Sequence, residues 1–167
     1  MPLILDHIGI LAPSIETLAA TLICMSEFQA ATDVVEDRFH GAKIMFLDSS
    51  SSRTRLELIE PMGEESPLTH GLERGGGVHH LCFQVATVEG IGSWCKKSSI
   101  RKVFGPYPAP AFGGRKVVFV HSPGLGLIEF VETKNAIDLE NLNDVSGKQL
   151  MKSFLDYKKL MNRKAKL

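Results

Sequence analysis

An internal repeat constrains the fold of this chain more than any other feature of its sequence. His7 opens a short apolar segment at residues 6–10, and His80 opens a similar segment 73 residues later. Near the end of each repeat, segment 56–60 matches segment 128–132 at an offset of 72 residues, with a glutamate at equivalent places. Each half therefore begins with a histidine strand and ends with a glutamate strand, a pattern that indicates two related modules able to converge on one site.

Length, charge and cysteine content limit the class of protein. The 167 residues suffice for one domain, or for two small modules that share a core, without disulfide bonds. Formal net charge is zero, which gives no sign of a nucleic-acid or membrane partner. No apolar run approaches the roughly 20 residues of a membrane span, and no signal peptide is expected. The three cysteines lie in apolar segments, which favours reduced thiols and a cytoplasmic location.

Hydrophobic periodicity predicts the order β-α-β-β-β in both halves. The expected elements are a strand at 3–11, a helix at 15–26 and strands near 30–37, 42–48 and 54–60, followed by a strand at 78–85, a helix at 88–98 and strands near 101–104, 115–121 and 126–132. The prolines at 106, 108 and 110 predict a loop, because proline cannot sustain a central strand. We therefore expect an α+β fold of two tandem βαβββ modules, at about 3–61 and 78–133, joined by a connection at 62–77.

The last 34 residues, 134–167, lie outside the repeat. From about Val145 onward, apolar residues recur at helical spacing, and the end of the segment is basic. This pattern predicts a C-terminal amphipathic helix that docks on the body of the protein or at a dimer interface.

Four residues are candidates for holding a divalent metal ion: His7, Glu57, His80 and Glu129. Because side chains alternate along a strand, each histidine shares a face with a small residue two positions on, which leaves room near the imidazole. Both glutamates have aliphatic neighbours, and a carboxylate in such a strand is costly to bury unless it is paired or bound to a cation. Two histidines and one or two glutamates suit Co, Ni, Mn, Zn, Mg or Fe(II), whereas three ligands alone would match an iron triad.

Other titratable residues compete with these candidates. Glu60 and Glu132 also match across the repeat, and strand parity alone does not choose between this pair and the pair 57/129. The position of Glu60 beside a proline favours a solvated side chain. His79 is expected to face away from its neighbour His80 and not to bind the metal.

Three histidines have no partner in the repeat and are interpreted as loop or strand-end residues: His40, His70 and His121. Among these three, His121 is the residue favoured to line a pocket. Cys82 is expected to be a small core residue.

The repeated strand motifs resemble the vicinal oxygen chelate superfamily, which includes glyoxalases, bleomycin-resistance proteins and dioxygenases. The resemblance covers about residues 3–133 and is strongest to the methylmalonyl-CoA epimerase branch, through the Glu-Pro of 60–61, the Ser-Pro of 66–67 and the Gly-Val-His-His of 77–80. It implies a single domain at 1–133 whose curved mixed sheets surround a metal, with the helical extension 134–167 outside it. It also implies a homodimer and metal ligands at His7, Glu57, His80 and Glu129.

The resemblance implies an epimerase that removes the proton next to the thioester carbonyl of a small substrate such as an acyl-CoA, while a divalent metal stabilises the enolate. Glu129 and Lys43 are the candidate bases; Lys43 stands where one bacterial form of the epimerase carries a glutamate base. Lys116 occupies the matching place in the second half, so both lysines could equally be structural. The alternatives are a glyoxalase-type lyase, an Fe(II) dioxygenase and a non-catalytic protein that binds a small ligand.

Overall fold

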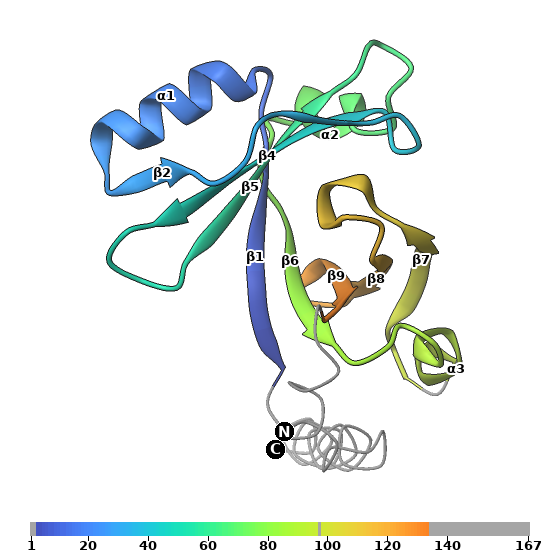
Figure 1. Ribbon diagram of the computed structural model, residues 1–167. Helices are drawn as coiled ribbons and strands as arrows, with labels where there is room; N and C mark the ends of the chain where they lie inside the picture. Colours follow the sequence, from blue (N-terminus) through green and yellow to red (C-terminus); the bar gives the residue numbers. More distant parts are fainter. Residues whose placement is uncertain (1–2, 97, 134–167) are drawn as a thin grey trace, which may run out of the picture.

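The computed structural model describes residues 3–96 and 98–133, which form one curved, open sheet with short helices on it (Figure 1). Within these residues the sheet has nine strands, in the order β2-β4-β5-β1-β6-β9-β8-β7, with β3 also paired to β4. The α+β fold class expected from the sequence is confirmed. The predicted C-terminal helix falls at 134–167, outside the described residues.

The elements follow the predicted order closely. They are β1 (Ile4–Leu11), α1 (Ile15–Met25), β2 (Phe28–Ala30), β3 (Val35–Asp37), β4 (Ala42–Ser49), β5 (Arg55–Pro61), α2 (Thr69–Glu73), β6 (Gly77–Val85), α3 (Ile91–Cys95), β7 (Arg101–Pro108), the 3-10 turn η1 (Pro110–Phe112), β8 (Lys116–Ser122) and β9 (Gly126–Glu132). None of the helices within 3–96 and 98–133 is of a length and hydrophobicity suited to crossing a membrane.

Strand pairing reproduces the sequence repeat in space. Each histidine strand pairs in parallel with the glutamate strand of its own half, β1 with β5 and β6 with β9. The two histidine strands then pair with each other in antiparallel fashion at the centre of the sheet. This arrangement brings all four strands that carry candidate metal ligands side by side.

Helix α1 begins where the sequence predicts it, because Ser14 supplies an N-cap. Its side chain accepts a hydrogen bond of 3.2 Å from the backbone N–H of Thr17, which satisfies one of the free donors of the first turn. The buried face of the helix, Ile15 and Ala19, packs with Leu47 of β4 and other apolar residues of the sheet.

Three local differences from the prediction have physical causes. The strand expected at 30–37 is split into β2 and β3, and between them the Thr32 hydroxyl accepts the N–H of Phe46 at 3.1 Å. Helix α3 begins only at Ile91, because Gly90 has a left-handed backbone with φ of 86°. The prediction of a loop at 105–110 is wrong, since β7 continues to Pro108; this strand is the edge of the sheet, where proline is tolerated.

Leu47 offers a test of the core between α1 and the sheet. Its side chain is fully buried in a cluster with Ile15 and Leu58. We expect Leu47→Ala to lower the free energy of unfolding by about 2–5 kcal/mol, because it leaves a cavity in this cluster. Urea denaturation would measure the loss. The matched variant Leu125→Ala, at a turn residue that is 61% exposed, should stay within about 0.5 kcal/mol of the wild type, and equal losses in both would contradict the assigned core.

Candidate metal centre

The candidate ligands lie in two adjacent rows that cross the centre of the sheet. In one row, Gly9 of β1 stands between Glu57 of β5 and His80 of β6. In the other, Cys82 of β6 stands between His7 of β1 and Glu129 of β9. Each row therefore has one glutamate, one small residue and one histidine, and each row draws on both halves of the chain.

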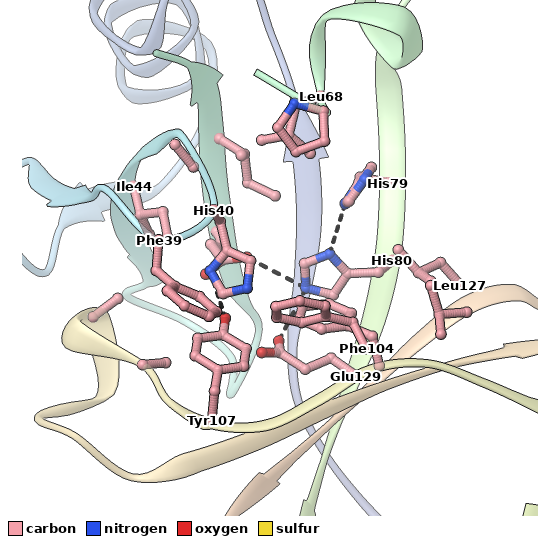
Figure 2. A pocket seen from close by; sticks show the side chains of 18 of the residues that line it. Phe39, His40, Ile44, Leu68, His79, His80, Phe104, Tyr107, Leu127 and Glu129 are labelled. Atoms are coloured by element: carbon pink, nitrogen blue, oxygen red, sulfur yellow. Dashed lines mark hydrogen bonds and ion pairs between the residues drawn. The ribbon is translucent and has the colours of Figure 1, made fainter. Parts of the chain in front are cut away.

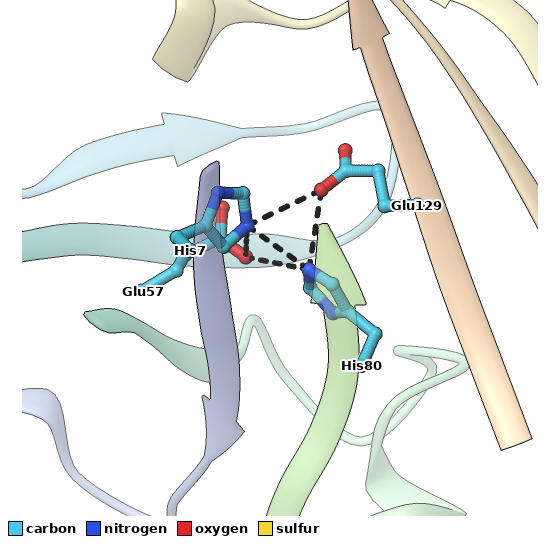
Figure 3. A group of neighbouring side chains, drawn as sticks. All are labelled: His7, Glu57, His80 and Glu129. Atoms are coloured by element: carbon cyan, nitrogen blue, oxygen red, sulfur yellow. Dashed lines mark hydrogen bonds and ion pairs between the residues drawn. The ribbon is translucent and has the colours of Figure 1, made fainter. Parts of the chain in front are cut away.

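The four side chains converge on a common point (Figure 3). The Nε2 atoms of His7 and His80 are 3.1 Å apart, and each lies 3.1–3.4 Å from an Oε2 atom of Glu57 and of Glu129. Ligands about 2.1 Å from one divalent ion lie about 3.0–3.4 Å apart at octahedral or tetrahedral angles. The spacing of these four donor atoms therefore fits a single metal ion.

Burial and unmet bonding also fit a cation at this point. His7 is 1% exposed, and Glu57, His80 and Glu129 are each 3% exposed. Oε2 of Glu129 is buried, and no hydrogen bond reaches it from any described residue. A buried carboxylate oxygen in this state is costly, and a metal ion would satisfy it.

The histidine charges are set by the two glutamates. Burial alone would lower the pKa of both imidazoles, but the neighbouring carboxylates raise the pKa of His80 to about 9 and that of His7 well above its ordinary value. Burial alone would raise the pKa of Glu57 and Glu129, and the two histidines instead lower it. The cluster thus favours positive charge between the carboxylates, which protons or a divalent cation can supply.

Outer hydrogen bonds fix the direction of His7. Its Nδ1 lies 2.9 Å from Oδ1 of Asp6, whose other oxygen accepts a hydrogen bond of 2.7 Å from the side-chain amide of Gln84. The Asp6 carboxylate therefore holds the proton on Nδ1 of His7 and turns Nε2 toward the cluster. A carboxylate behind a ligating histidine is the usual outer support of a metal site.

His79 holds His80 in a similar way, which corrects the expectation that it faces away. The two Nδ1 atoms are 3.0 Å apart, and β1 and β6 shift register beside them, so simple alternation fails there. Burial, together with the positive charge of His80, lowers the pKa of His79 to about 4. His79 is therefore neutral and accepts the Nδ1 proton of His80, so that Nε2 of His80 faces the cluster.

Gly9 makes room for the imidazole of His80. A Cβ atom at position 9 would lie 2.5 Å from Nδ1 and 2.8 Å from Nε2 of that ring, distances that real side chains do not tolerate. The sequence predicted that small residues leave space near the imidazoles, and at Gly9 the space is taken by the histidine of the opposite half.

Cys82 lies behind His7, with Asp6 as a further neighbour, and this trio could also form a metal-binding group. Burial raises the pKa of the Cys82 thiol well above its ordinary value, with the charge of Glu129 adding to the effect. A protonated thiol is a poor ligand, so the cluster of four is the better candidate.

The competing glutamates bind backbone N–H groups, at the start of α1 in the first half and in the segment before α3 in the second. Glu60 accepts a hydrogen bond of 2.9 Å from the backbone N–H of Ile15, and Glu132 lies 3.3 Å from the N–H of Val88, its counterpart in the repeat. The register therefore assigns Glu57 and Glu129 to the cluster. The Glu60 side chain is 20% exposed and paired, which corrects the expectation that it is solvated.

Lys43 is turned away from the cluster. Its neighbours Ala42 and Ile44 line the adjoining pocket, whereas its ammonium group donates a hydrogen bond of 2.8 Å to Glu60. That hydrogen bond and the charge of Glu60 raise the pKa of Lys43. A lysine that acts as a base needs a lowered pKa, so this placement does not favour Lys43 as the base.

The cluster opens into a cavity of about 380 Å³, a size suited to a small molecule (Figure 2). Apolar and aromatic side chains form most of its wall; its polar lining residues are Glu57, Glu129, His40, His79, His80 and Tyr107. The histidine expected to line a pocket, His121, is instead an exposed residue of β8.

Sequence reasoning missed His40 as a pocket residue, because it has no counterpart in the repeat. The signal that could have found it is Asp37, an acidic residue three positions earlier, which is almost fully buried and binds the imidazole.

Comparison with known proteins gives relatives in sequence and one solved structure with the same kind of fold. The chain is 30% identical over 121 residues to the ethylmalonyl-CoA/methylmalonyl-CoA epimerase of Cereibacter sphaeroides. The matched region covers 70% of this chain and 87% of that protein. It is 29% identical over 126 residues to human mitochondrial methylmalonyl-CoA epimerase, and this match covers 73% of this chain and 68% of the human protein. The crystal structure of methylmalonyl-CoA epimerase from Mycobacterium tuberculosis matches with a TM-score of 0.68 at 21% identity, covering 80% of this chain and 90% of that one.

Fold, cluster and cavity together define a class: a domain with a curved mixed sheet that holds a His/Glu cluster, able to bind a metal, beside a small-molecule pocket. The family model described as Glyoxalase/Bleomycin resistance protein/Dioxygenase superfamily matches residues 6–119. The chain belongs to this superfamily.

Proposed function

We propose that this protein is a divalent-metal-dependent epimerase, which removes and returns the proton next to the thioester carbonyl of methylmalonyl-CoA or a close analogue. The observation that carries the proposal is the buried cluster of His7, Glu57, His80 and Glu129 at the wall of an apolar cavity. The relatives named methylmalonyl-CoA epimerase support the choice of substrate.

Epimerisation requires positive charge near the enolate oxygen, an apolar environment and groups that transfer protons, and residues of this chain can supply them. A divalent ion held by the four ligands would provide positive charge to stabilise an enolate oxygen. The apolar and aromatic wall of the cavity provides surroundings of low polarity, in which electrostatic interactions are stronger than in water. Epimerisation also requires proton transfer at both faces of the α-carbon, and Glu129, which lines the cavity, is a candidate for one face.

The family resemblance adds a homodimeric assembly to this proposal, and the cysteines in apolar segments add a cytoplasmic location. Light scattering on the purified protein would test the first, and cell fractionation would test the second.

Proton NMR of methylmalonyl-CoA in D₂O tests the function directly. With Co(II)-loaded protein, we expect the α-proton signal to disappear, because each removal and return replaces it with deuterium. With chelator-treated protein, the signal should decay only as fast as it does in buffer without protein. Metal-loaded protein that causes no exchange would contradict the proposal and direct attention to a glyoxalase-type or oxygen-dependent reaction.

A further inference from the structure

His40 lies in the wall of the cavity with no part in the metal cluster. It follows β3 and precedes β4, and in Figure 2 it stands with Tyr107 across the cavity from His79 and His80. Aromatic rings surround its imidazole, with centroids at 4.0 Å for Tyr107 and 4.9 Å for Phe104. This packing holds the ring in place and keeps water from much of it.

Two polar neighbours fix Nδ1 of His40. Oδ2 of Asp37 lies 2.8 Å from this nitrogen, and the hydroxyl oxygen of Tyr107 lies 2.7 Å from it. The other oxygen of Asp37 accepts the backbone N–H groups of Phe39 and His40 at 3.0 and 3.1 Å, so the carboxylate is itself immobile. A carboxylate in this position holds the proton on Nδ1 and leaves the lone pair on Nε2.

Nε2 of His40 is buried and has no hydrogen-bond partner among the residues that the structure describes. A histidine kept only for structure would be expected to pair both of its nitrogens, because an unpaired buried polar atom costs stability. The fixed ring thus leaves a proton-accepting atom unused beside the cavity.

His40 is also close to the metal cluster without contacting its ligands through a hydrogen bond. The ring of Phe119 packs near both histidines, with its centroid 6.3 Å from that of His40 and 5.5 Å from that of His80. A small substrate bound in this cavity is therefore enclosed by a wall that contains both His40 and the cluster residues Glu57, His80 and Glu129.

We propose that His40 is a proton-transferring residue of this pocket, acting at one face of the substrate's α-carbon while a second proton donor, in exchange with water, acts at the other. This inference rests on the proposed function. Nε2 of His40 takes the α-proton, and the electrons of the broken C–H bond move into the thioester carbonyl as the enolate. A proton from the second group then forms the new C–H bond on the opposite face; the reverse reaction, or exchange with water, restores both groups.

The test follows deuterium exchange into each epimer of methylmalonyl-CoA separately, with metal-loaded wild type and His40→Gln. We expect the variant to lose exchange at least about 100-fold for one epimer and to retain it for the other, because only one face loses its base. A structural effect would instead slow both epimers together. His40→Phe, which suits the aromatic surroundings, serves as a second variant and should give the same one-sided loss.

The matched control is His121→Gln, which alters an exposed histidine outside the cavity and should exchange both epimers at the wild-type rate. Metal content is measured for every variant and should stay at the wild-type level. Equal exchange of both epimers by His40→Gln, or an equal loss for both, would overturn the assignment of His40 while the proposed function stands. No exchange by the wild type would overturn the proposed function and this assignment together.

Discussion

Replacement of His80 by alanine is expected to abolish stoichiometric binding of a divalent metal, whereas His79→Ala should retain it with an affinity about 10–100-fold lower. His80 contributes one of the four converging donor atoms, and its loss leaves Glu57 and Glu129 partly unpaired in a buried site. His79 is hydrogen-bonded to Nδ1 of His80, on the side away from the cluster, and outer partners of this kind tune affinity. Calorimetric titration with Co(II) would measure both variants.

These two neighbouring histidines form an internal control for each other, because each variant removes one imidazole from the same strand. Far-ultraviolet circular dichroism would establish that both variants are folded. Full binding by His80→Ala, combined with loss of binding by His79→Ala, would mean that the two residues have been assigned to the wrong positions around the cluster.

Gly9→Ala should also remove metal binding, although it deletes no ligand. The added methyl group would occupy the space of the His80 ring, which has β1 on one side and the ring of Phe119 on another. The imidazole must then move, and its Nε2 leaves the point where the other three donors meet. We expect a fall in Co(II) affinity of at least about 100-fold, since ligand geometry within about 0.5 Å is needed for a functional site.

The matched control for this change is Gly92→Ala in α3. A Cβ atom there meets only the Lys102 side chain, at an ordinary contact distance of 3.7 Å, and alanine is favoured over glycine within a helix. Gly92→Ala should bind Co(II) as the wild type does. Wild-type affinity in Gly9→Ala would show that the His80 ring has another position from which it can bind.

The repeat made both the sheet and the cluster predictable, because it marks which strand in one half corresponds to which strand in the other. His7 and His80 occupy equivalent places in the two copies, as do Glu57 and Glu129. This equivalence predicted that the four residues meet at one site although they are far apart in sequence. Strand parity left Glu57 and Glu60 as alternatives, and the structure decides between them because Glu57 meets both histidines whereas Glu60 binds the start of α1. Such contacts depend on how helices and strands pack against each other, and the spacing of residues in the sequence does not give this packing.

The residues that sequence reasoning misplaced lie where regular alternation ends. His79 turns toward His80 at a register shift between β1 and β6. His40 lies just before a strand, in a turn whose direction is set by Asp37 and by the distant Tyr107. Lys43 is an exception, because regular alternation with its cavity-lining neighbours Ala42 and Ile44 places it on the opposite face, where it pairs with Glu60.

Two copies of a module within one chain free each copy to diverge. The repeat equivalent of His40 is Gly113, which has a left-handed backbone and open space where a side chain would be. An assembly of two identical modules would have to place the same residue at both positions and would offer a substrate two identical ends. In the tandem chain, a nearly twofold-symmetric set of ligands is enclosed by an asymmetric wall, so a bound molecule has a single preferred orientation.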